Sequence, residues 1–128
     1  MLNYDQLQEL VMSNLLLIEI DSTAIRESKE RAAKFLVVQA HLANHLKSLE
    51  DIKVKASTIE KAQYAQSLMS QGGKNVTENK INAEADPRYA QARESVELVD
   101  AEINWTKKHY DIFGNAHIMF RQYSNMQM

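Results

Sequence analysis

The stretch QGGKNVTENKINAEADPRY, residues 71–89, interrupts a sequence that otherwise favours helix. The 70 residues before it contain neither glycine nor proline, whereas the stretch holds two of the chain's three glycines and its only proline. Gly72 and Gly73 are typical of a helix end, because glycine readily adopts the left-handed C-cap conformation. Asp86 followed by Pro87 is typical of a helix start, because proline at the first helical position lacks an N–H that would have no partner there. We therefore expect the chain to fold back on itself at this stretch.

The pattern of apolar residues on either side predicts a single all-α domain over residues 1–128. The fold class we expect is an elongated helical hairpin, similar to a coiled coil, that assembles into a homo-oligomer. Its expected elements are an N-terminal helix over 1–21, a long helix over 22–71 with an N-cap in residues 21–23, a glycine-containing loop and short helix (capped by Thr77) over 72–86, a C-terminal helix over 87–123, and a tail over 124–128.

A seven-residue register runs along the long helix. One series comprises Phe35, Leu42, Leu49 and Ala56, and the other comprises Val38, Ile52 and Ile59, with His45 interrupting it. Such heptads favour a supercoiled partner, which is either another segment or another copy of the chain. A helix of this length either kinks near 48–54 or makes the protein elongated, and an elongated protein would cover its apolar seams by self-association.

Composition limits the classes of function. The chain has no cysteine, which excludes disulfides and thiolate metal sites and suits a reducing cytoplasm. Its longest aliphatic run, residues 15–18, is far too short to span a membrane, and no basic segment at the N-terminus indicates a signal peptide. We expect a cytoplasmic protein without a membrane partner.

Catalytic motifs are missing from the sequence. His41 and His45 have the spacing of a zinc helix, but the segment HLANH lacks the glutamate of H-E-x-x-H, so we expect no metal site. The glycines at 72–73 and Lys74 do not form a phosphate-binding loop, and no nucleophile stands beside a base. The sequence predicts neither an enzyme nor a bound cofactor.

The middle of the chain is its most basic part, although the formal net charge is −2. Lysines neutralise phosphates without reading bases, and a neighbouring tyrosine offers a stacking surface for an unpaired base. The nucleic-acid-binding residues that we predict are Lys53, Lys55, Lys61, Tyr64, Lys74 and Lys80. A solvated surface that binds nothing is the alternative interpretation.

From Lys53 to its end, the chain resembles the UvsY-like recombination mediators of T-even-type bacteriophages. The shared pattern is the segment KVKASTIEKAQYAQS, a glycine-containing loop, the helix start AEADPRY, and a final helix with INW followed by FGNAHIMFRQ. The resemblance covers about 75 residues. It implies a ring-like homo-oligomer that binds single-stranded DNA and helps to load a RecA-type recombinase onto strands covered by single-strand-binding protein, in the infected bacterial cell.

By position, Lys61 and Tyr64 resemble the DNA-contacting pair of that family, with Lys55 as the next candidate, although Glu60 stands where the family is more basic. The C-terminal helix resembles the part that forms the oligomer. The apolar residues that we expect at this interface are Val99, Ile103, Trp105, Ile112, Phe113 and Phe120.

Two other functional classes remain open from the sequence. One is a helical phage protein that binds or inhibits a host protein, with its acidic helix imitating a nucleic acid. The other is a structural coiled-coil or assembly protein without DNA binding.

Overall fold

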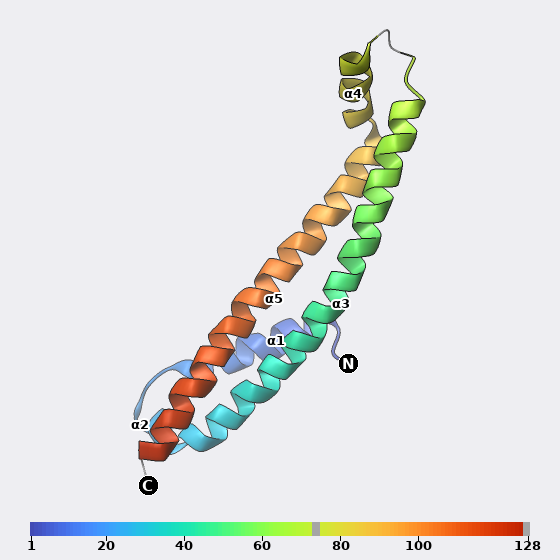
Figure 1. Ribbon diagram of the computed structural model, residues 1–128. Coiled ribbons are helices and arrows are strands. Elements are labelled where there is room, and N and C mark those ends of the chain that lie inside the picture. The colour runs from blue at the N-terminus through green and yellow to red at the C-terminus, as the bar shows by residue number, and fades with distance from the viewer. Residues whose placement is uncertain (73–74, 127–128) are drawn as a thin grey trace. The chain divides into compact units, whose positions relative to one another are not determined.

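The protein is all-α, as the sequence predicts, with two long helices that pack against each other as a hairpin (Figure 1). The computed structural model describes residues 1–72 and 75–126, and no strand occurs among them. The elements in chain order are α1 (Tyr4–Leu15), the 3₁₀ helix η1 (Leu16–Ile18), α2 (Ser22–Arg26), α3 (Ser28–Met69), α4 (Val76–Glu84) and α5 (Pro87–Met126). None of these helices combines the length and apolar character that a membrane span requires.

The N-terminal elements are shorter than predicted. Asn3 and Gln6 form a reciprocal capping box at the start of α1, and the helix gives way to η1 after Leu15. Asp21 is the predicted N-cap, and its carboxylate accepts a hydrogen bond from the backbone N–H of Ala24 at 2.6 Å.

The sequence leaves open whether residues 23–70 form one helix or two, and the structure has two, because Glu27 separates α2 from α3. Near this break, the guanidinium of Arg31 donates to the carbonyl oxygens of Leu17 at 2.7 Å and of Glu19 at 3.5 Å. The two carbonyls belong to residues that follow α1, and Arg31 supplies them with a hydrogen-bond donor close to the turn at Glu27. Further along, α3 continues without a break through residues 48–54, where we considered a kink.

The chain forms two compact units, and both α3 and α5 contribute residues to each of them. Unit 1 combines residues 1–47 with 104–128, of which 127–128 are not described, and unit 2 comprises residues 48–103.

Three phenylalanines form the centre of unit 1. Phe35 lies 5.7 Å from Phe113 and 5.3 Å from Phe120 between ring centroids, and none of the three is exposed. Larger apolar side chains from α1 and α3 pack into the same core, namely Leu7, Val11, Val38 and Leu42. The seven-residue register is therefore buried within the chain in unit 1.

Gly114 lies in the same unit and allows a close approach. A Cβ at this position would stand 2.6 Å from Nε2 of Gln39, whose amide donates weakly to the carbonyl of Tyr110 at 3.5 Å. The side chain of Gln39 therefore occupies the space that a larger residue at 114 would need.

Unit 2 buries less apolar surface between its helices. Leu49 and Ile103 are buried, but Ile52 and Ile59 of the second heptad series are 48% and 62% exposed. On α3, the more buried side follows Leu49, Ala56, Glu60 and Ser67 at 3.6-residue spacing, which places Ile52 and Ile59 off the contact line. Ile52 and Ile59 therefore remain largely exposed instead of packing between the helices of unit 2.

The end of α3 differs from the glycine C-cap that we expected. Gly72 does not have a positive φ, and Gly73 lies outside the described residues. The side chains of Ser70 and Gln71 instead donate to the carbonyl of Ser67, each at 2.9 Å. Because these side chains satisfy a terminal carbonyl, the helix ends without a left-handed glycine at 72.

The starts of the last two helices were predicted with mixed success. The N-cap of α4 is Asn75, which accepts from the N–H of Glu78 at 2.7 Å, so the prediction of Thr77 is wrong. Pro87 is the first residue of α5, as predicted, and α5 continues to Met126 rather than ending at 123. No glycine or proline interrupts residues 124–126, so the helix extends into the predicted tail.

Candidate nucleic-acid interface

A cleft of about 250 Å³ in unit 2 contains two of the predicted DNA-binding residues. Lys61 and Tyr64 of α3 line it together with Glu60, Glu84 of α4 and Tyr89 of α5. The rings of Tyr64 and Tyr89 lie 5.2 Å apart between centroids at an angle of 57°, and both are half-buried. The cleft therefore presents a contiguous aromatic surface next to an ammonium group.

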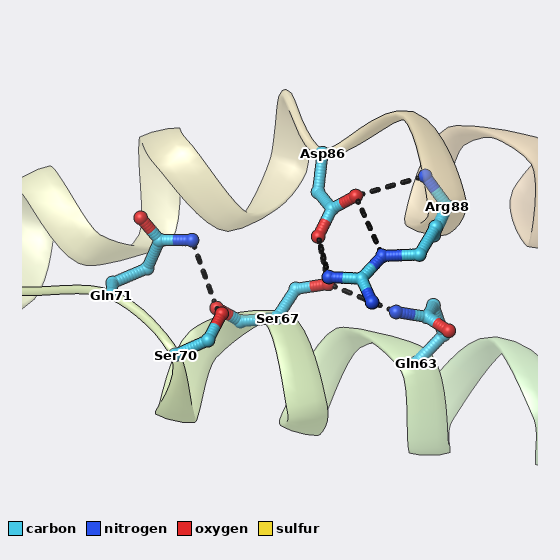
Figure 2. Close-up of polar contacts among 6 residues, drawn as sticks. All are labelled: Gln63, Ser67, Ser70, Gln71, Asp86 and Arg88. Atoms are coloured by element: carbon cyan, nitrogen blue, oxygen red, sulfur yellow. Dashed lines mark hydrogen bonds and ion pairs between the residues drawn. The ribbon is translucent and has the colours of Figure 1, made fainter.

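A polar cluster holds Tyr89 against Tyr64. Asp86 accepts from the hydroxyl of Ser67 at 2.7 Å and from the backbone N–H of Arg88 at 2.9 Å, as Figure 2 shows. Ser67 is fully buried and in turn accepts from the amide of Gln63 at 3.2 Å. Because Asp86 is the residue before Pro87, these bonds fasten the first turn of α5, which carries Tyr89, to α3.

These bonds also lower the pKa of Asp86 below its ordinary value of 3.8. The largest cause is the hydrogen bond from the Ser67 hydroxyl, followed by that from the backbone N–H of Arg88, since both favour the charged carboxylate. The guanidinium of Arg88, 3.4 Å from the same carboxylate, adds to this effect.

Lys53 is not a free cation. Its ammonium lies 2.7 Å from Oδ1 of Asp100, with 46% and 43% of the two side chains exposed. A phosphate group would have to compete with this carboxylate.

The remaining lysines do not share one surface. Lys55 and Lys61 are six residues apart on α3, so their side chains leave the helix about 120° apart. Lys80 is exposed on α4, and Lys74 lies outside the described residues. Of the five predicted residues that the structure describes, it thus brings together only Lys61 and Tyr64 in the cleft.

The net charge of unit 2 is negative. Residues 48–103 hold seven Lys and Arg against ten Asp and Glu. A nucleic acid would therefore meet single ammonium groups, such as that of Lys61, rather than a broad positive surface.

The residues predicted for the oligomer interface occupy different environments. Phe113 and Phe120 are fully buried in the core of unit 1, and Ile103 is 5% exposed in unit 2. A second chain could contact the two phenylalanine rings only if that core opened. Trp105 packs at the edge of the unit 1 core, where it contacts Tyr4 edge to face at 5.5 Å.

The other two predicted interface residues, Val99 and Ile112, are partly exposed. The large apolar side chains that are most exposed in the middle of unit 2 are instead Ile52, Val54, Ile59 and Leu98. These four were not among the residues that we assigned to the interface.

The histidines considered for a metal site have other surroundings. His45 stacks on the ring of Tyr4 with centroids 5.4 Å apart. In the part of the chain that the structure describes, no group of three or more potential ligands gathers.

Sequence reasoning did not single out Tyr89 or Glu84. Tyr89 stands 25 positions after Tyr64, and only the folding back of the chain brings the two rings together. The sequence feature that could have identified Tyr89 is an aromatic residue in the first turn of the helix that begins at Pro87.

Comparison with known proteins yields no match. No family model fits the chain, and neither a curated protein nor a solved structure is significantly similar to it.

Proposed function

We propose that this protein binds single-stranded DNA through unit 2 and, as a ring-like homo-oligomer, promotes loading of a RecA-type recombinase onto strands covered by single-strand-binding protein. The observation that carries the proposal is the cleft, where Lys61 stands beside the paired rings of Tyr64 and Tyr89. The recombinase-loading role in the proposal comes from the resemblance of residues 53–128 to the UvsY-like mediators. Such a protein would act in the cytoplasm of an infected bacterium.

In this proposal the cleft holds one nucleotide of an unpaired strand. An ammonium neutralises a backbone phosphate whatever the base, and a tyrosine ring supports a stacked base with about 1–3 kcal/mol. Both groups face the same cleft of about 250 Å³. A duplex base could not use the ring, because its faces are already stacked.

The acidic balance of unit 2 makes a single copy a weak binder. Several copies joined together would repeat the cleft along one strand, and each further contact would then form at a high effective concentration. Ile52, Ile59 and Leu98 are exposed apolar residues that contacts between copies would cover. The mediator mechanism is then to bind the strand at repeated points and favour the recombinase over the resident coat protein.

A titration of labelled oligo-dT at several salt concentrations tests DNA binding. We expect binding that weakens as salt rises, because contacted phosphates release counterions. Changing Lys55 and Lys61 to alanine should weaken binding while light scattering shows an unchanged oligomer.

The matched control changes two exposed lysines of unit 1, Lys29 and Lys107, to alanine, which removes the same charge. Equal losses of affinity in the two double variants would contradict the assignment to unit 2. A second assay measures the activity of a RecA-type recombinase on single strands coated with single-strand-binding protein. The protein should raise that activity, and no effect would refute the mediator role.

A second candidate is a self-associating protein that works without DNA. The acidic balance of unit 2 and the pairing of Lys53 with Asp100 favour it. A structural assembly protein would form an oligomer but give no oligo-dT binding even at low salt. A protein that inhibits a host enzyme would instead co-purify with that enzyme.

A further inference from the structure

Two carboxylates share the cleft with the tyrosine pair. Glu60 is half-buried on α3, and Glu84 is exposed at the end of α4. Within residues 1–72 and 75–126, neither carboxylate has an ion-pair or hydrogen-bond partner, and both line the same cavity as Lys61. A cleft that served only to hold phosphates would gain nothing from these two groups, since they repel a phosphate.

Carboxylates can read the edge of a base. An ionised carboxylate only accepts hydrogen bonds, and the exocyclic amino group of cytosine is a donor that glutamate accepts in known nucleic-acid complexes. Thymine presents a carbonyl oxygen at the corresponding position, which a carboxylate repels. The two tyrosine rings are inclined at 57°, so a base stacks on one of them and contacts the other at an angle. Such a base gains or loses affinity according to the group that it directs at Glu60 and Glu84.

We propose that this cleft selects nucleotides whose base carries an exocyclic amino group, so that the protein prefers cytosine to thymine in single strands. The proposal rests on the proposed binding of single-stranded DNA and adds a base preference to it. Tyr64 and Tyr89 support the base, Glu60 and Glu84 accept from its amino group, and Lys61 neutralises the adjoining phosphate.

The test compares labelled oligo-dC with oligo-dT of equal length by fluorescence anisotropy. The two strands carry the same charge and pyrimidine bases of similar size, which differ in their hydrogen-bonding edge and in the C5 methyl group of thymine. We expect oligo-dC to bind roughly fivefold more tightly, the size of effect that one hydrogen bond to a partly exposed charged group provides.

A pair of double variants identifies the groups responsible. Glu60→Gln with Glu84→Gln gives side chains that both donate and accept, so the preference should fall to about twofold or less. Glu50→Gln with Glu94→Gln removes the same charge from exposed positions outside the cleft, and the preference should persist there. Both double variants should bind each strand more tightly than the original protein, because two negative charges are lost.

The outcomes separate the two proposals. Equal binding of oligo-dC and oligo-dT by the original protein, or a preference that survives in the cleft variant, overturns the base selection and leaves DNA binding in place. Failure to bind either strand overturns the proposed function itself.

Discussion

The ion pair between Lys53 and Asp100 suggests a substitution that should strengthen DNA binding. Its two charged atoms are 2.7 Å apart, and each side chain is a little less than half exposed. Asp100→Asn leaves a side chain of the same shape without the charge. We expect this change to release the Lys53 ammonium for contact with a phosphate.

Asp100→Asn should affect both the free energy of unfolding and the salt dependence of DNA binding, and the size of each effect can be estimated. An exposed ion pair contributes about 0.2–1 kcal/mol, so the free energy of unfolding should change by no more than that. Each phosphate neutralised on a single strand adds about −0.7 to the slope of log K against log salt. The slope should thus become steeper by about 0.7 for every protomer that contacts the strand.

The assay is fluorescence anisotropy of labelled oligo-dT over a series of salt concentrations. Glu94→Gln is the matched control, because it removes one negative charge from the exposed surface of the same helix at a position without a lysine partner in the described residues. The control should bind somewhat more tightly through the change in net charge but add no phosphate contact.

Equal slopes for the two variants would refute the reasoning. Such a result would mean that Lys53 stays remote from the strand after its partner is removed. Chemical denaturation and light scattering on both variants would verify that the fold and the oligomer are unchanged.

Two further predictions concern the fold. Phe113→Ala removes a ring that is fully buried against Phe35, so the free energy of unfolding should fall by about 3–5 kcal/mol in chemical denaturation. An unchanged unfolding midpoint with loss of the oligomer would instead place this ring between copies of the chain. Asp86 has a lowered pKa in the folded protein, so the stability it contributes is present above its ordinary value of 3.8 and is lost as pH falls below that value. Asp86→Asn should therefore melt at a lower temperature near neutral pH and show a smaller acid-dependent decrease than the original protein, and parallel melting curves from pH 5 downward would contradict this role.

Local signals predicted two helix starts correctly. The aspartate at 21 and the pair formed by Asp86 and Pro87 act within their own helix turns, so no distant contact is needed for them to begin a helix. The sequence left open whether residues 23–70 form one helix or two, and the break at Glu27 lies near a more distant contact, that of Arg31 with the carbonyl of Leu17, fourteen positions earlier.

The candidate site was only partly predictable. Lys61 and Tyr64 are one turn apart, so their proximity follows from helix geometry. The neutralisation of Lys53 by Asp100 and the pairing of Tyr64 with Tyr89 join α3 to α5. These contacts depend on the register between two helices, and the apolar pattern alone did not specify that register in unit 2.

The amino-acid sequence by itself determined that this chain is helical, that its long helix ends before the stretch at residues 71–89, and where its lysines lie along α3. These properties arise from backbone preferences and from contacts within one or two helix turns. Only the tertiary structure decided which lysine is neutralised, which aromatic residue joins Tyr64, and that Phe113 and Phe120 face the core of their own chain. The reason is that burial and charge pairing depend on the helix that lies opposite, and the folding back of the chain brings that helix into place.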